Sequence, residues 1–106
     1  WQPTCMQGRA LPTDVTAFIQ FRGDGRLLGH TACNRLLGEY RLEGQQIQLV
    51  PLSSTRKACD AAVMRQERAL IETLQKVRSF RRVRTRLLLF GGDGLPILEL
   101  RQTDWD

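Results

Sequence analysis

The chain has 106 residues, of which 42% are hydrophobic and 25% are charged. This length predicts a single domain over residues 1–106 with one modest hydrophobic core. No apolar run approaches the ~18 residues of a membrane-spanning helix, so we expect no such helix within these 106 residues. Because the sequence begins at Trp1 and not at a methionine, we expect an upstream segment that carries an export signal or a lipid anchor.

The N-terminal half shows the alternation of apolar and polar residues that is typical of half-buried strands. Residues 23–25 (Gly-Asp-Gly) and 43–44 (Glu-Gly) predict hairpin turns, since Asp-Gly in particular readily supplies positive φ angles. Residues 34–38 are expected to break the pattern, and the Ser- and Thr-rich residues 52–59 are expected to form a loop. The expected strands cover residues 1–6, 15–21, 26–33, 39–42 and 46–50.

One amphipathic helix is predicted over residues 60–78, because apolar side chains recur there at helical spacing. Asp60 is the expected N-cap, since its carboxylate can accept hydrogen bonds from the amides of the first turn. The apolar stripe of this helix consists of Val63, Leu70, Ile71, Leu74 and Val77.

Short strands separated by glycine turns, with one helix between them, predict the α+β class. We expect a small antiparallel sheet, barrel-like or rolled, of about eight short strands, with the helix inserted after the fifth strand. A turn is predicted at residues 91–94 (Gly-Gly-Asp-Gly), and Pro96 belongs at an edge or a strand start because it lacks an amide donor. The strands expected after the helix cover residues 80–83, 86–90 and 95–101.

Glu67 lies near the middle of the apolar stripe of the predicted helix. A buried carboxylate needs an ion pair or hydrogen bonds, and Arg35 and Arg56 lie in the polar segments beside two of the cysteines. The functional alternative is a catalytic acid, but no second acid or nucleophile accompanies Glu67. We therefore predict a structural ion pair of Glu67 with Arg56 or Arg35 that fixes the helix against the loops.

The three cysteines, Cys5, Cys33 and Cys59, leave at least one thiol outside any intramolecular disulfide. A Cys33–Cys59 disulfide is the favoured pairing, and it requires an oxidising compartment. Two separate buried thiols and a bridge to Cys5 are the alternatives. His30 with Cys33 and Cys59 could suggest zinc, but residues three apart on a strand point to opposite faces, so we predict no metal site.

Catalytic motifs are missing from the sequence. The polar residues 53–55 (Ser-Ser-Thr) lack a nucleophile elbow, and the single histidine, His30, has no evident orienting acid. The glycines fit hairpin turns and none opens a helix, which argues against a phosphate-binding loop. The sequence therefore predicts neither an enzyme nor a bound cofactor.

Five arginines at the end of the predicted helix and after it contribute much of the net charge of +5. Such a cluster attracts anions, and it would make the chain a basic binding module for anionic polymers or lipid headgroups. The alternative, which we favour, is a solvated strand and turn. If residues 80–86 form one strand, Arg82, Arg84 and Arg86 share a face, and a turn near residues 84–85 would separate them. The candidate anion-binding residues are Arg78, Arg81, Arg82, Arg84 and Arg86.

Three motifs of the sequence resemble those of the META domain, or HslJ-like domain, of bacterial envelope proteins. That family shows Gly-His-x-Gly-Cys-Asn-Arg-x-x-Gly-x-Tyr, then Leu-x-Ser-Thr-Arg-x-x-Cys, then Met-x-x-Glu. Ala32 stands where the family usually has glycine, Cys5 has no counterpart, and the arginine cluster is heavier than the pattern requires. The matching residues are Gly29, His30, Cys33, Asn34, Arg35, Gly38 and Tyr40, then Leu52, Ser54, Thr55, Arg56 and Cys59, then Met64 and Glu67.

This resemblance covers nearly the whole chain and implies an exported protein that is periplasmic or attached to the outer membrane, often as a lipoprotein. Some family members are linked to heat induction, novobiocin resistance, virulence or secretion, and no enzymatic activity is established for them. The fold is similar to the cracked barrel of type III secretion pilot lipoproteins, which can hold a lipid or a peptide.

The resemblance thus implies a non-enzymatic domain that supports envelope assembly or stress tolerance by binding a protein or a lipid. Nucleic acid is not an expected partner, and an upstream segment could attach the domain to a membrane. In this interpretation the motif residues build the scaffold. They are Cys33, Asn34, Arg35, Thr55, Arg56, Cys59 and Glu67.

Overall fold

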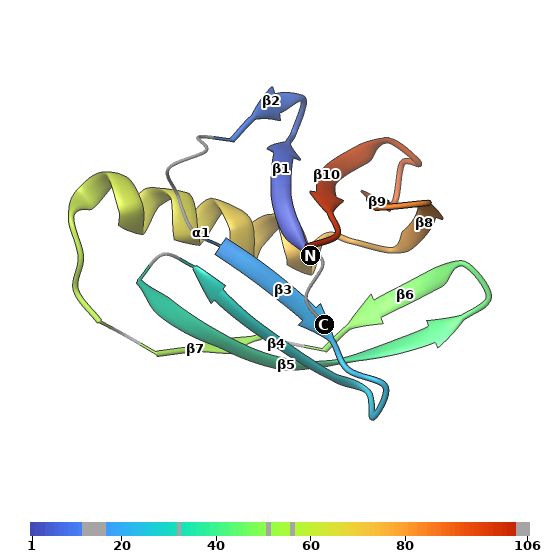
Figure 1. Cartoon of the computed structure of the whole chain (residues 1–106), viewed down its shortest axis with the longest axis horizontal. Coiled ribbons are helices and arrows are strands. Elements are labelled where there is room, and N and C mark those ends of the chain that lie inside the picture. The colour runs from blue at the N-terminus through green and yellow to red at the C-terminus, as the bar shows by residue number, and fades with distance from the viewer. Residues whose placement is uncertain (12–16, 32, 51, 56, 104–106) are drawn as a thin grey trace.

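One helix packs against a sheet of ten strands in the computed structural model, which describes residues 1–11, 17–31, 33–50, 52–55 and 57–103 (Figure 1). The helix is α1 (Ala61–Gln75). The strands are β1 (Gln2–Met6), β2 (Arg9–Ala10), β3 (Ala17–Phe21), β4 (Arg26–Thr31), β5 (Asn34–Glu43), β6 (Gln46–Leu49), β7 (Ser53–Ser54), β8 (Ser79–Val83), β9 (Arg86–Phe90) and β10 (Pro96–Arg101).

The strand order is β2-β1-β10-β9-β8-β6-β5-β4-β3, with β7 paired to β5, and the pairings are antiparallel. The α+β class is therefore confirmed. The sheet is open, however, because this order ends at β2 and β3 and no strand ladder among the described residues joins the two ends. The sheet curls only far enough for the backbones of Trp1 and Ile19 to exchange hydrogen bonds of 2.9 and 2.7 Å. The expectation of a barrel-like or rolled sheet is therefore confirmed only in part, because the sheet curls but does not close.

The number of strands and the position of the helix also differ from the expectation, since α1 follows the seventh described strand and not the fifth. β2 and β7 have two residues each, which is too short to show alternation in a sequence. Residues 34–38 do not break the sheet: they begin β5, where Asn34 and Leu36 are buried and Arg35 is exposed. Pairing with β4 and β7 overrides the turn preference of Asn and Gly there.

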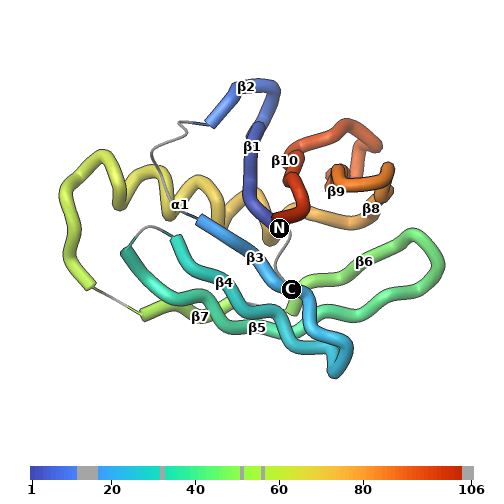
Figure 2. The backbone as a smooth tube through the Cα atoms, in the orientation of Figure 1, coloured from blue at the N-terminus to red at the C-terminus, as the bar shows by residue number. Residues whose placement is uncertain are grey.

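The three turns predicted at residues 23–25, 43–44 and 91–94 each join two paired strands (Figure 2). Gly25, Gly44 and Gly94 adopt the positive φ angles of 88°, 63° and 81° that their turns require. Pro96 is the first residue of β10. The start of the strand expected over residues 15–21 lies outside the described residues.

The helix begins as predicted, because the Asp60 side chain accepts a hydrogen bond of 3.0 Å from the Val63 amide. It ends at Gln75, earlier than the expected residue 78. Leu70 and Leu74 of the predicted stripe are buried in α1, and Val77 is buried just after it. No helix formed by the described residues has the length and apolar character needed to cross a membrane. The core consists of Ile19, Leu27, Leu36, Ile47, Leu70, Leu74, Val77, Leu87, Leu89, Leu98 and Leu100.

Candidate functional site

Glu67 is buried on the face of α1 that meets β4 and β5, with 8% of its surface exposed. Its Oε2 accepts a hydrogen bond of 3.0 Å from Asn34 Nδ2, and its Oε1 accepts one from the Thr31 hydroxyl. Thr31 and Asn34 are a cross-strand pair of β4 and β5, so both side chains point to the inner face. Both carboxylate oxygens therefore have a hydrogen-bond donor, as a buried carboxylate requires.

Asn34 connects this carboxylate to the segment before the helix. Its Oδ1 accepts hydrogen bonds from the Thr55 hydroxyl at 2.9 Å and from the Lys57 amide at 2.7 Å. Its Nδ2 also lies 3.3 Å from the Lys57 carbonyl, and the side chain is almost fully buried. We refer to Thr31, Asn34, Thr55, Lys57 and Glu67 as the Asn34 cluster. The Asn34 side-chain amide joins β5 to α1 and to the segment before the helix, and Thr31 joins β4 to α1 through the Glu67 carboxylate.

The predicted ion pair of Glu67 with Arg35 is wrong. Arg35 follows Asn34 in β5, and strand alternation turns its side chain to the opposite, exposed face. What Arg35 contributes is its backbone, since its amide donates to the Thr55 hydroxyl at 3.0 Å. The other expected partner, Arg56, lies outside the described residues. Neutral donors take the place of the expected arginine at both described contacts of the carboxylate.

A disulfide joins Cys33 to Cys59, with 6.5 Å between their Cα atoms, and this is the pairing favoured from the sequence. It connects the β4–β5 turn to the residues just before α1, beside the Asn34 cluster. Cys5 lies half-buried in β1 and is unpaired in the part of the chain that the structure describes.

Among the residues that the structure describes, no metal-ligand group forms around these cysteines. The described residues contain no cluster of three or more His, Cys, Asp or Glu side chains that could hold a metal ion. His30 instead stacks on Phe18, with 6.1 Å between the ring centroids.

The Asn34 cluster and the disulfide together suit a structural role. No buried side-chain nitrogen or oxygen among the described residues lacks a hydrogen-bond partner, so none is left over in the cluster to recognise a ligand. Thr31 and Lys57 were not singled out from the sequence. The signal for Thr31 was its place two residues after Gly29 on the buried face of β4, whereas Lys57 acts through its backbone and leaves no such signal.

The arginine cluster does not form one surface, because the chain turns at Arg84, where φ is 57°. Arg82 faces the same side as its cross-strand partner, the buried Leu87, whereas Arg86 lies on the other face. Arg86 is also ion-paired with Glu99, with 2.5 Å between Nη2 and Oε1. Arg81 alternates away from Arg82 along β8.

Arg78 is engaged at the end of the helix. Its Nη1 donates hydrogen bonds of 3.1 and 2.9 Å to the carbonyls of Gln75 and Val77. This contact satisfies carbonyl groups that the helix end leaves without partners. Arg78 therefore acts in helix termination and not in a shared anion site.

An apolar pocket of about 160 Å³ opens between the β5–β6 hairpin and the β8–β9 hairpin. No residue of α1 lines it. Phe21 and Tyr40 pack edge to face in its wall, with 5.2 Å between their ring centroids. Leu42 at the rim keeps 54% of its surface exposed. We call this the aromatic pocket, and it is lined by Trp1, Phe21, Tyr40, Leu42, Ile47, Phe80, Arg82, Leu87 and Leu89.

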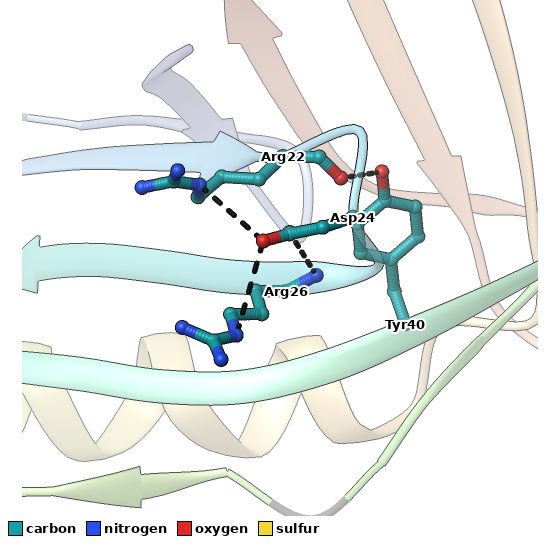
Figure 3. A network of polar contacts seen from close by, with 4 residues as sticks. All are labelled: Arg22, Asp24, Arg26 and Tyr40. Atoms are coloured by element: carbon teal, nitrogen blue, oxygen red, sulfur yellow. Dashed lines mark hydrogen bonds and ion pairs between the residues drawn. The ribbon is translucent and has the colours of Figure 1, made fainter.

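A hydrogen bond to the β3–β4 turn holds the Tyr40 ring in this wall (Figure 3). The Tyr40 hydroxyl donates to the Arg22 carbonyl. In the same turn, Asp24 Oδ2 lies 3.9 Å from Nε of Arg22 and 3.8 Å from Nε of Arg26. The guanidinium groups of Arg22 and Arg26 extend away from the Tyr40 ring, and neither residue lines the pocket (Figure 3).

Arg82 is the one charged residue among the described residues that line the pocket. Its guanidinium carbon lies 5.3 Å from the centroid of the Trp1 ring, within the range of a cation–π contact. Its Nε donates to the Arg84 carbonyl and its Nη2 to Oε1 of Gln102, both at 3.0 Å. These contacts fix the guanidinium at the rim of the pocket.

Comparison with solved structures identifies two similar folds. An NMR structure of a protein from Burkholderia xenovorans matches with a TM-score of 0.70 and 22% identity, over 97% of this chain and 79% of that one. The crystal structure of a DUF4847 family protein from Bacteroides vulgatus matches with a TM-score of 0.64 and 17% identity, over 83% of this chain. This chain spans only 60% of the length of the DUF4847 protein. At these identities the likeness shows the fold alone.

Comparisons at the level of sequence identify the family. No curated protein matches the sequence significantly. The family model described as META domain matches residues 1–104. The motif residues Cys33, Asn34, Thr55, Cys59 and Glu67 also meet in one place in the structure. The match over nearly the whole sequence shows that this chain belongs to the META domain family.

Proposed function

We propose that this META domain is a non-enzymatic binding domain of the bacterial cell envelope, periplasmic or attached to the outer membrane. In this proposal it supports envelope assembly or stress tolerance by binding a protein or a lipid through the aromatic pocket. The pocket is the observation that carries the proposal, because it brings aromatic side chains, an exposed leucine and a fixed arginine to one opening.

The lining of the pocket favours a protein as the ligand. Trp, Tyr and Arg are the side chains most enriched among the residues that dominate protein–protein binding energies. The volume of about 160 Å³ is close to the ~150 Å³ of a cavity that holds one benzene ring. It lies well below the ~300–1,000 Å³ of sites that enclose a whole small molecule. The pocket thus suits one large apolar side chain better than a complete lipid.

Two further observations support the envelope location and the absence of catalysis. The Cys33–Cys59 disulfide is the kind of bond that persists in an oxidising compartment such as the bacterial periplasm. Glu67, the one carboxylate considered as a catalytic acid, is buried and engaged by Thr31 and Asn34.

Substitution of Leu42 with glutamate tests the role of the pocket in the natural host. A charge at the rim should prevent an apolar group from entering the pocket. A host strain whose only copy of the protein is Leu42→Glu should therefore lose at least about tenfold in survival under envelope stress. Leu37 is the matched control: it lies on the same strand, is 53% exposed against 54% for Leu42, and does not line the pocket. Survival is measured by plating after heat or detergent treatment.

Leu37→Glu should leave survival unchanged, and both variants should melt within a few degrees of the parent protein, because both side chains are half-exposed. Equal survival of the two variants would refute the proposed role of the pocket.

A further inference from the structure

We propose that the aromatic pocket receives the C-terminal residue of a partner polypeptide. A large apolar terminal side chain fills the pocket, and the terminal carboxylate binds Arg82. This inference rests on the proposed function and names the chemistry of the partner.

The Arg82 guanidinium is held ready for an anion. Trp1, the Arg84 carbonyl and Gln102 fix its position, and the two hydrogen bonds use two of its five N–H groups. The other N–H groups have no hydrogen-bond partner among the described residues. A planar guanidinium matches the two oxygens of a carboxylate, and such charge-assisted pairs are stronger than neutral hydrogen bonds.

The charges around the pocket favour an anionic group beside an apolar one. Among the described residues no carboxylate lines the pocket, and Arg82 is the charged side chain there. An apolar residue inside a polypeptide carries no charge near its side chain. A C-terminal residue carries a carboxylate on the same Cα as its side chain, which places both groups within reach of the pocket and of Arg82.

The edge of β8 beside the pocket favours a polypeptide over a free fatty acid. β8 pairs with β6 through one residue pair, Ser79 with Gln46, and the Phe80 amide then donates to the Gln45 carbonyl at 2.9 Å. Beyond Phe80, no described residue pairs with this edge of β8 in a strand ladder. Open strand edges bind extended peptides through their backbone N–H and C=O groups. Phe80 and Arg82, which line the pocket, belong to this strand.

The test uses a dye-labelled peptide, Gly-Ser-Gly-Ser-Phe, with the dye at its N-terminus and binding to the intact protein followed by fluorescence anisotropy. The free acid should bind at least about tenfold more tightly than the same peptide with an amidated C-terminus. Arg82→Gln should reduce this ratio to less than about twofold. Arg81→Gln is the matched control, because Arg81 is equally basic but alternates away from Arg82, and it should keep the tenfold ratio.

Three other results would refute, in turn, the role of the carboxylate, the role of the pocket and the choice of a polypeptide as the ligand. Equal binding of acid and amide, abolished by Leu42→Glu, would refute the role of the carboxylate and leave the proposed function standing. No binding of either peptide at millimolar concentration, together with unchanged survival of the Leu42→Glu strain, would refute both. Hexanoate that binds as tightly as the peptide acid would identify a free fatty acid as the ligand and refute the polypeptide.

Discussion

Replacing Asn34 with alanine is expected to lower the free energy of unfolding by about 3 kcal/mol. The substitution removes donors and acceptors that serve Glu67, Thr55 and the backbone of Lys57, all from a side chain that is almost fully buried. It leaves the Glu67 carboxylate with one donor fewer and the Lys57 amide without its partner. Unfolding by guanidinium chloride, followed by circular dichroism, measures the loss.

Two controls separate this cluster from the ion pair expected from the sequence. Glu67→Gln keeps an oxygen that can accept from Asn34, and its amide can donate to the Thr31 hydroxyl, so it should cost only about 1 kcal/mol. Arg35→Ala should change stability by less than about 0.5 kcal/mol, because that side chain is exposed. A loss from Arg35→Ala as large as that from Asn34→Ala would contradict the arrangement described here.

Removal of the Cys33–Cys59 disulfide is expected to cost about 3 kcal/mol. The two cysteines are separated by 26 positions, and a crosslink of that span restricts the unfolded chain substantially. The double variant Cys33→Ala, Cys59→Ala should therefore melt well below the parent protein in differential scanning calorimetry. Reducing the parent protein should produce a similar shift.

Cys5→Ala provides the control for this experiment, since Cys5 is half-buried and outside the disulfide. It should lower stability by less than about 1 kcal/mol and should not alter the effect of a reducing agent. A parent protein that is insensitive to reduction, with a double variant of equal stability, would argue against a stabilising bridge.

Much of the local structure follows from the sequence, because it depends on contacts between near neighbours. Alternation identifies the core face of β4 and β9, glycines identify the turns, and Asp60 identifies the start of α1. The motifs that resemble the META domain also bring Asn34, Thr55 and Glu67 together, as the structure shows.

The partner of Glu67 could not be predicted in this way. Sequence reasoning pairs a carboxylate with an arginine, and Arg35 is close in sequence to the right residue, Asn34. Only the register of β4 with β5 decides which of the two faces the helix. Because residues 34–38 were expected to lie outside the sheet, their pairing with β4 was not predicted. The role of Asn34 was therefore not predicted either.

The aromatic pocket could not be predicted for a different reason. Alternation assigns Phe21, Tyr40 and Phe80 to the inner face of the sheet. It does not show whether other side chains cover these three rings or leave a pocket beside them. That depends on where α1 ends and on how the two hairpins diverge, which are properties of the tertiary structure. The sequence identifies Arg82 as a candidate for anion binding. The expected partner Arg86, however, lies on the other face of the sheet and pairs with Glu99.

Methyl-group NMR of the intact protein, titrated with the free-acid peptide, tests most directly whether the aromatic pocket is the binding surface. The account predicts that the shifted methyl signals belong to residues lining the pocket and that those of Leu28 and Leu37, on the surface outside it, stay in place. Shifts confined to Leu28 and Leu37, with the pocket signals unmoved, would contradict the account. The pocket signals to be followed are those of Leu42, Ile47, Leu87 and Leu89.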